Sequence, residues 1–333
     1  MRRLLRSPGT FPAPGVFSML EMTRSHRCPL SQSFARLLFL ASLFLLLGTV
    51  LFPPPTATAG SAPLPDQIAR GKYVFGAAGG CGCHTEPGKT LNSGGRKYEG
   101  PFGTVYSSNI TPDKETGIGT WTDEQIITAI RLGRRPNGDR LIPVHPYIVF
   151  NGMSEEDLRS VVAYLRTVPP VNRANQPKKI VPLFESVALP VWLAAFAPKE
   201  TPPPTAPTSG IARGEYLVRA VGHCGECHTP RTLTYATDNS RFLAGTSKGP
   251  DGTPVQNITP DKDTGLIWSV DEIAWFLGTG NKPDGDVVGG VMGEVIQGTS
   301  AGYKDLTEAD RQAIARYLKS IPPIKNKVDM TKK

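Results

Sequence analysis

The feature that most constrains this chain is an internal repeat, in which residues 64–172 return with substitutions as residues 208–325. The matching segments are Ile68-Ala-Arg-Gly-Lys-Tyr with Ile211-Ala-Arg-Gly-Glu-Tyr, and Asn109-Ile-Thr-Pro-Asp-Lys with Asn257-Ile-Thr-Pro-Asp-Lys. A tryptophan follows the second motif in each copy, and each copy closes with Tyr-Leu and a Pro-Pro pair. We therefore predict two copies of one domain. The Pro-rich residues 173–207 between them are predicted to be a linker.

Both repeats show helical patterns. Residues 68–78 and 211–221 are predicted to form the first helix of each repeat. Ser154 and Thr307 stand before acidic residues and an apolar helical face, which is typical of an N-cap. No segment alternates apolar and polar residues over the length of a strand, and the sequence between the helices is rich in Gly, Pro, Asn and Asp. The predicted fold class is all-α, with two small tandem domains and long loops, whose thin cores need a cofactor to fill them.

The cysteines indicate which cofactor this is. Cys224-Gly-Glu-Cys227-His228 is a complete C-x-x-C-H, the attachment signature of haem c. Two thiols one helical turn apart can add to the two vinyl groups of a haem, and the adjacent His228 then faces the iron. A disulfide, a zinc pair and a thioredoxin-like redox pair are the alternatives. Zinc needs more ligands than this segment offers, and the βαβ context of a thioredoxin motif is absent.

The first repeat has a shortened version of this motif, Cys81-Gly-Cys83-His84. Residues i and i+3 of a helix share a face, whereas residues i and i+2 do not. Cys83, which keeps its place beside His84, is therefore predicted to form a single thioether. Cys81 is predicted to be free or attached with local distortion. The sequence thus predicts two haem c groups, with His84 and His228 as proximal iron ligands.

The distal iron ligands are expected downstream of these motifs. Met292 lies in a glycine-rich stretch of the second repeat, and a thioether is a natural ligand in an electron-carrying haem. A core methionine is the alternative reading. When the two repeats are aligned without gaps, His145 takes the place of Met292, which would give the first haem two histidine ligands. Met153 is the other candidate in the first repeat, and His145 is preferred only slightly.

The N-terminus is predicted to direct export. Residues 37–52 are apolar apart from Ser42, Gly48 and Thr49, and Ala57-Thr-Ala follows them. A stretch of this length is short for a membrane span and suits the apolar region of a signal peptide. Residues 1–59, which include Cys28, are therefore predicted to be a cleaved signal, with an uncleaved membrane anchor as the alternative. Export would place the chain in the periplasm or at the outer face of the cytoplasmic membrane.

The positive charge of the chain belongs mostly to this N-terminal segment. The net charge is +8, and residues 1–59 hold six arginines and one acidic residue, which leaves +3 for the remainder. A nearly neutral remainder gives no support to nucleic-acid binding.

The two repeats resemble the multihaem c-type cytochromes, in particular dihaem cytochromes and the cytochrome c subunits of periplasmic alcohol and aldehyde dehydrogenases. The resemblance rests on C-x-x-C-H, on Asn-Ile-Thr-Pro-Asp with the following Thr-Gly and Trp, and on the Tyr-Leu and Pro-Pro ending. It implies class I-like cytochrome c domains, with Trp121 and Trp268 near the haem propionates and the Asn-Ile-Thr-Pro-Asp turns along the haem pocket. The implied partners are a dehydrogenase as electron donor and an oxidase or another cytochrome as acceptor.

The predicted function is an exported dihaem electron carrier that is not itself an enzyme. The alternative is a haem enzyme of peroxidase-like or thiosulfate-oxidising type, which needs an open coordination position at the first haem and an acid–base group beside it. No convergent carboxylate or arginine constellation in the sequence supports such a site. A membrane-tethered redox subunit of a larger complex is compatible with the carrier.

Overall fold

The computed structural model describes residues 64–80, 82–197, 205–250, 252–298 and 300–331. The predicted export segment 1–59, with Cys28 and the apolar residues 37–52, lies outside the described residues, and so does Cys81. Among the helices that are described, none combines the length and the apolar character that a membrane crossing requires.

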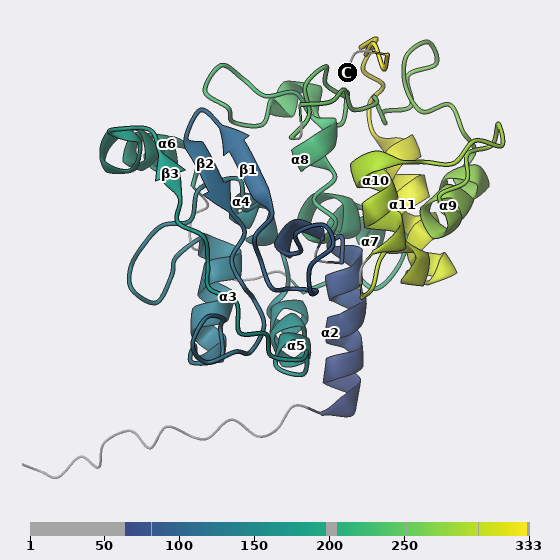
Figure 1. Ribbon diagram of the computed structural model, residues 1–333. Helices are drawn as coiled ribbons and strands as arrows, with labels where there is room; N and C mark the ends of the chain where they lie inside the picture. Colours follow the sequence, from purple (N-terminus) through teal and green to yellow (C-terminus); the bar gives the residue numbers. More distant parts are fainter. Residues whose placement is uncertain (1–63, 81, 198–204, 251, 299, 332–333) are drawn as a thin grey trace, which may run out of the picture. The chain divides into compact units, whose positions relative to one another are not determined.

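Helices are the main regular elements of both repeats (Figure 1). The first repeat contains α2 (Pro65–Ala77), α3 (Asp123–Leu132), α4 (Tyr147–Phe150) and α5 (Glu155–Leu165). The segment between the repeats contains α6 (Leu189–Phe196), which a π-helical turn precedes (Phe184–Ala188). The second repeat contains α7 (Gly210–Tyr216), α8 (Gly225–His228), α9 (Val270–Thr279), α10 (Gly290–Gln297) and α11 (Glu308–Ser320). Short 3-10 turns occupy Gly82–His84, Asn239–Arg241 and Tyr303–Asp305, and a second π-helical turn occupies Leu217–Val221.

The all-α prediction is wrong, because the structure contains a three-stranded antiparallel sheet. Strands β1 (Lys97–Gly100) and β2 (Gly103–Tyr106) form a hairpin in which Gly100 pairs with Gly103. Strand β3 (Lys179–Ile180) pairs with β2 and comes from the segment predicted to be a linker (Figure 1). Strands of four and two residues are too short to show alternation in a sequence. The pairing of β3 also depends on residues far away along the chain.

The predicted first helices are confirmed as α2 and as α7 with the π-helical turn that continues it. Both predicted N-caps are confirmed as well. The Ser154 hydroxyl accepts a hydrogen bond from the backbone N–H of Asp157, and the Thr307 hydroxyl accepts one from Asp310, each at 3.2 Å. These bonds satisfy backbone donors that have no partner inside the helix.

A glycine lets the first and last helices of each repeat approach closely. A Cβ atom on Gly71 of α2 would lie 1.8 Å from the Ser160 carbonyl oxygen of α5. A Cβ atom on Gly214 of α7 would lie 2.0 Å from the Ala313 carbonyl oxygen of α11. The glycine of the repeated Ile-Ala-Arg-Gly segment is therefore required by packing in both copies.

We expect Gly71→Ala to destabilise the protein even though alanine favours a helix. The added methyl group must push α2 away from α5, and such overpacking costs about 1–3 kcal/mol. Denaturant unfolding measures the loss. Gly289→Ala is the matched control, because nothing lies within 4 Å of a Cβ at that position. An unchanged unfolding midpoint for Gly71→Ala would contradict the close helix crossing.

The repeated tyrosine of the same segment crosses to the other repeat. The Tyr73 hydroxyl donates to the Asp310 carboxylate at 2.6 Å and accepts from the Thr307 backbone N–H at 3.2 Å. Arg213, from the same repeat as Asp310, donates to this carboxylate through Nε at 2.9 Å and through Nη2 at 2.8 Å. The N-terminus of α11 is thus capped by a side chain from α2.

A tyrosine of the second repeat makes the same contacts with the last helix of the first repeat. The Tyr216 hydroxyl donates to the Asp157 carboxylate at 2.6 Å and accepts from the Ser154 backbone N–H at 3.1 Å. Arg70 completes the cluster with a hydrogen bond from Nε to Asp157 at 2.8 Å. In each repeat the arginine therefore contacts the last helix of its own repeat, and the tyrosine contacts the last helix of the other repeat. The main hydrophobic core likewise contains residues of both repeats.

Candidate haem sites

The two predicted proximal histidines lie in equivalent surroundings. His84 ends a 3-10 turn, His228 ends α8, and both rings are half-buried. Nδ1 of His84 is 2.8 Å from the Ser108 carbonyl oxygen, and Nδ1 of His228 is 2.8 Å from the Gln256 carbonyl oxygen. A carbonyl oxygen only accepts, so Nδ1 carries the proton and Nε2 keeps its lone pair. This is the orientation that a metal-binding histidine needs.

The protonation state of these rings agrees with that role. Burial lowers the pKa of both His84 and His228 below the ordinary value, although the bond to the carbonyl opposes the shift in each case. Both imidazoles are therefore neutral at neutral pH, which is the form that binds a metal.

The Asn-Ile-Thr-Pro-Asp motif holds the carbonyl that orients each histidine. Asn109 directly follows Ser108, is 1% exposed, and donates through Nδ2 to the Val171 carbonyl at 2.8 Å. Its Oδ1 accepts from the Thr111 backbone N–H and hydroxyl. Asn257 and its threonine repeat these bonds in the second copy. The motif therefore joins the segment that accepts the histidine hydrogen bond to the residues that follow the Pro-Pro pair.

His145 lies near His84, at a separation of the rings that suits one metal ion between them. The two ring centroids are 6.5 Å apart and the ring planes are inclined by 73°. Two metal–imidazole bonds of about 2 Å each, with the distance from each ring centre to its nitrogen, span nearly this length. Nδ1 of His145 is buried without a hydrogen-bond partner among the described residues. Burial, with the nearby His84, lowers the pKa of His145 to about 3, so this ring is also neutral.

The described cysteines are free thiols rather than a disulfide. Cys83 is exposed, and Cys224 and Cys227 are half-buried. Burial raises the pKa of Cys224 to about 11, and burial together with the charge on Cys83 raises that of Cys227 to about 12. Thiolate redox pairs and zinc ligands need a lowered pKa. Cys224 and Cys227 are therefore not activated as thiolates by their surroundings, and no disulfide joins the described cysteines.

Comparison with known proteins agrees with this geometry. The chain is 37% identical over 281 residues to a diheme cytochrome c-type protein of Cereibacter sphaeroides, covering 79% of this chain and 88% of that protein. This chain belongs to the dihaem c-type cytochromes. It is an electron-transfer protein with haem c as its cofactor, and it is not itself a dehydrogenase. No family model matches the sequence.

Two further relatives are subunits of larger enzymes by name. The cytochrome is 37% identical over 290 residues, 84% of this chain, to the gluconate 2-dehydrogenase cytochrome c subunit of Pantoea cypripedii. It is 39% identical over 273 residues, 77% of this chain, to the cytochrome c subunit of a quinone alcohol dehydrogenase from Gluconobacter oxydans. The matches cover only 64% and 55% of those two proteins.

The other predicted ligands of the cytochrome lie in different surroundings. Met153 is 2% exposed, is part of the hydrophobic core, and its carbonyl accepts from Arg131 at 2.9 Å. Met153 thus packs in the core, and the ring centroid of His145 lies 6.5 Å from that of His84, so the distal ligand of the first haem stays a prediction. Met292 lies on α10, half-buried against the main core. Its ligation of the second haem stays a prediction.

The two predicted propionate neighbours are half-buried against the main core of the cytochrome. The Trp121 carbonyl accepts from Arg166 at 2.5 Å, and the Trp268 ring lies 5.1 Å from Phe276. Their contact with propionates stays a prediction.

Sequence reasoning missed one cation at the first site. The Arg135 guanidinium donates to the Ser108 hydroxyl at 2.9 Å, and its charge helps to lower the pKa of both His84 and His145. A cation that close to two ligand candidates suits a haem propionate. The pair of arginines at 134–135, ahead of a Pro-Asn-Gly turn, was the available sequence signal.

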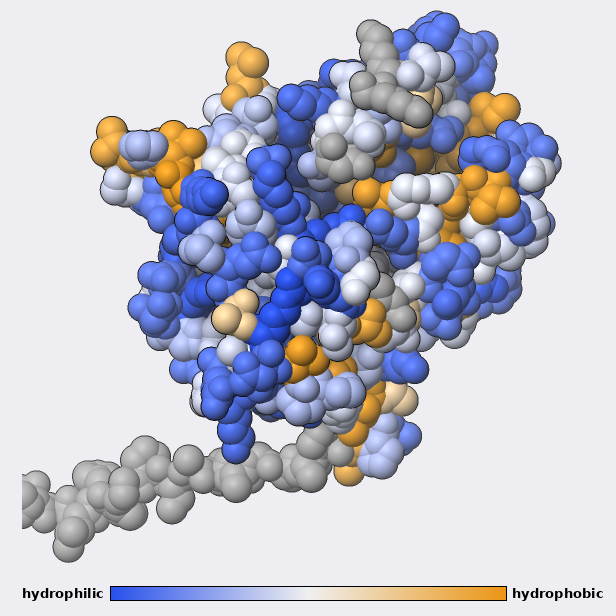
Figure 2. Space-filling model, in the orientation of Figure 1, coloured by the Kyte–Doolittle hydropathy of each residue, from blue (hydrophilic) through white to orange (hydrophobic). Residues whose placement is uncertain are grey.

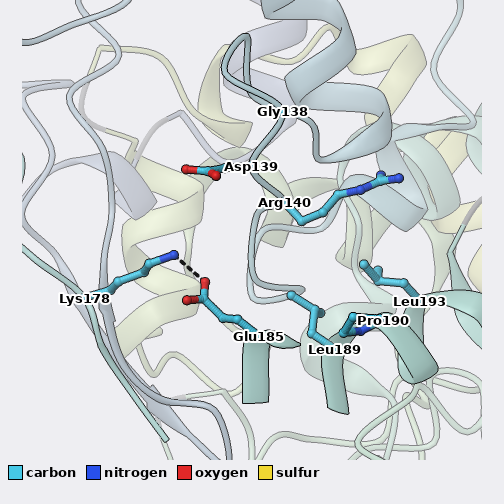
Figure 3. Close-up of a pocket in the computed structure, with 8 residues that line it drawn as sticks. All are labelled: Gly138, Asp139, Arg140, Lys178, Glu185, Leu189, Pro190 and Leu193. Carbon is cyan, nitrogen blue, oxygen red and sulfur yellow. Dashed lines mark hydrogen bonds and ion pairs between the residues drawn. The ribbon is translucent and has the colours of Figure 1, made fainter. Parts of the chain in front are cut away.

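A separate cavity of about 310 Å³ lies between the turn at Gly138–Arg140 and α6 (Figure 3). An ion pair between Lys178 and Glu185 crosses it, and Leu189, Pro190 and Leu193 form its apolar side. The described residues that line this cavity include neither a cysteine nor a histidine. Apolar side chains also gather over α6 on the face shown in Figure 2, where Val191 and Phe196 are exposed.

Proposed function

We propose that the cytochrome is exported and carries electrons from a periplasmic dehydrogenase to a respiratory acceptor. The proposal of a dehydrogenase donor is supported by the relatives from Pantoea and Gluconobacter, which are named as subunits of gluconate and alcohol dehydrogenases. Export is supported by the apolar residues 37–52 and the following Ala-Thr-Ala.

The observation that carries the electron-transfer function is the opposed pair His84 and His145. Two nitrogen ligands close an iron to other molecules, which suits a carrier and not an oxidase or peroxidase. Cys83, which is exposed, would attach this first haem, and Arg135, which donates to the Ser108 hydroxyl, would pair with a propionate. A haem held there supplies reversible one-electron chemistry, while the chain sets its ligands and its burial.

The second haem is proposed to have a different ligand set. Cys224 and Cys227 would attach it, and His228 and Met292 would be its iron ligands. A methionine ligand raises the reduction potential relative to a second histidine. The two haems would therefore differ in potential, with the first haem lower, and this difference would give electron flow a direction.

The direct test is the mass, visible spectrum and redox titration of the purified mature protein. We expect two haems per chain, a pyridine haemochrome spectrum with one single-thioether haem, two separate potentials, and an N-terminus after residue 59. Colourless protein from a host that attaches haem would disprove the proposal. A mature chain that still starts at residue 1 would disprove cleavage and favour the uncleaved membrane anchor, whereas recovery of the haem-carrying protein from the cytoplasm would disprove export.

We expect His145→Ala to open the first haem. Loss of this ring removes a ligand and leaves a coordination position free, so the reduced variant should bind carbon monoxide whereas the natural protein should not. Met153→Leu is the matched control, because Met153 is a buried core residue and leucine conserves its volume. Carbon monoxide binding by Met153→Leu but not by His145→Ala would assign the ligand to Met153.

A further inference from the structure

A row of aromatic rings connects the two haem sites. His145, opposite His84, has its ring centroid 5.8 Å from that of Phe150, in an edge-on arrangement at 71°. The Phe150 centroid is 5.4 Å from that of His223, again edge-on at 75°. His223 directly precedes Cys224, the first attachment residue of the second haem. The row thus runs from a ligand candidate of one haem to the attachment loop of the other.

His223 is held in place by the opposite repeat. Its Nε2 is 3.2 Å from the Ala78 carbonyl oxygen, which accepts the hydrogen bond at the C-terminal end of α2. The backbone φ of His223 is +41°, a left-handed conformation that few residues other than glycine adopt. Such a conformation persists only where the surrounding contacts hold it, and it often marks a functional position.

The equivalent position of the first repeat shows that a ring is not required by the backbone. Gly80 takes this place, with a φ of +58°. A Cβ on Gly80 would lie 1.7 Å from the Ala301 carbonyl oxygen, so no side chain fits there. The second repeat has room at this position and uses it for a ring that contacts Phe150. Glycine would satisfy the same backbone at residue 223, so the histidine is explained by its side chain and not by the turn.

We propose that Phe150 and His223 form the contact that sets the rate of electron exchange between the two haem sites. The proposal rests on the proposed dihaem electron carrier. One electron leaves the reduced site and arrives at the oxidised site, and no bond or proton has to change. Electron transfer is fastest where the gap between the two sites is filled with packed atoms. These two rings fill the part of the repeat interface between His145 and Cys224.

The test compares His223→Gly and Phe150→Leu with the natural protein, all as full-length protein carrying haem. A light pulse excites an added photoreductant, which is oxidised as it gives one electron to the chain, and absorption then follows the redistribution of that electron between the haems. We expect each variant to slow this step several-fold, because truncating the ring leaves a void where packed atoms had filled the space between the two sites. Glycine tolerates the left-handed backbone at residue 223, so that variant keeps its loop without strain.

Two further measurements separate coupling from structure. Equilibrium redox titration and the visible spectrum report the ligands of each haem, and we expect both to stay unchanged in the two variants. Phe184→Leu makes the same chemical change at a ring that contacts Phe102 in the small cluster under the sheet, and it should leave the exchange rate unchanged.

The outcomes distinguish a failure of this inference from a failure of the proposed function on which it rests. Unchanged exchange rates in both variants, with two haems present, would overturn the role of these rings and leave the carrier intact. Electron exchange would then pass elsewhere, for example beside Cys83 and Cys227. Absence of haem in the natural protein would instead remove the proposed function itself. If His223→Gly loses its second haem, Phe150→Leu alone decides the question, since Phe150 lies outside the attachment loop.

Discussion

Purified protein in which both Cys224 and Cys227 are replaced by serine should carry one haem fewer than the natural chain. Serine keeps the size of cysteine but cannot form a thioether, so neither vinyl group can be attached. Mass spectrometry under denaturing conditions, which removes haem that is not covalently held, measures the difference directly.

The same double variant should be less stable. The second repeat is a small unit, and an attached haem adds apolar surface to its core that the variant lacks. Loss of the haem should therefore lower the free energy of unfolding by more than about 3 kcal/mol, the cost of truncating one buried Phe or Trp side chain. Denaturant unfolding, followed by far-UV circular dichroism, measures this loss.

Cys224→Ser alone is the informative control. It leaves Cys227 beside His228, the arrangement that Cys83 and His84 have in the first repeat. We expect this variant to keep both haems and to show two single-thioether haems in its pyridine haemochrome spectrum. Two haems in the double serine variant would show that the second haem is attached elsewhere, and the assignment of Cys224 and Cys227 would fail.

Replacing Asp310 by alanine should destabilise the contact between the repeats. Asp310 is 8% exposed and accepts hydrogen bonds from Arg213 and from Tyr73 of the other repeat. Removing one partner of a buried ion pair leaves the other charge uncompensated, which costs about 3–5 kcal/mol. Denaturant unfolding measures the loss. Asp271→Ala, which removes an exposed acid from the first turn of α9, is the control and should cost under about 1 kcal/mol.

The lowered pKa of Asp310 also predicts that the free energy of unfolding depends on pH. Burial raises its pKa, but the hydrogen bonds from Arg213 and Tyr73 outweigh burial and hold the pKa below the ordinary value. A lowered pKa in the folded state means that the stabilisation is complete above the unfolded pKa of about 3.9 and is lost as pH falls through the folded pKa. The stability difference between the natural protein and Asp310→Asn should therefore be constant from about pH 7 to pH 5 and shrink below about pH 4. A difference that grows on acidification would show that Asp310 is not a stabilising carboxylate.

The cross-repeat bonds explain one feature that the sequence alone leaves open. The repeat itself shows that Ile-Ala-Arg-Gly-x-Tyr returns, but not why the tyrosine is kept. In the structure the arginine and the glycine serve the helix pair of their own repeat, whereas Tyr73 and Tyr216 serve the other one. A pattern within one repeat cannot show which copy a side chain contacts, because both copies contain the same partner.

The sequence by itself determined the two repeats, their first and last helices with the caps Ser154 and Thr307, and the attachment signature that ends at His228. These features depend on neighbours a few residues away, so local spacing is enough to identify them. Only the tertiary structure decided the sheet, the short distance between the His145 and His84 rings, and the exchange of tyrosines between repeats. Each of these depends on which distant segments meet, and the free energy that brings them together comes from burial and long-range hydrogen bonds, which leave no period in the sequence.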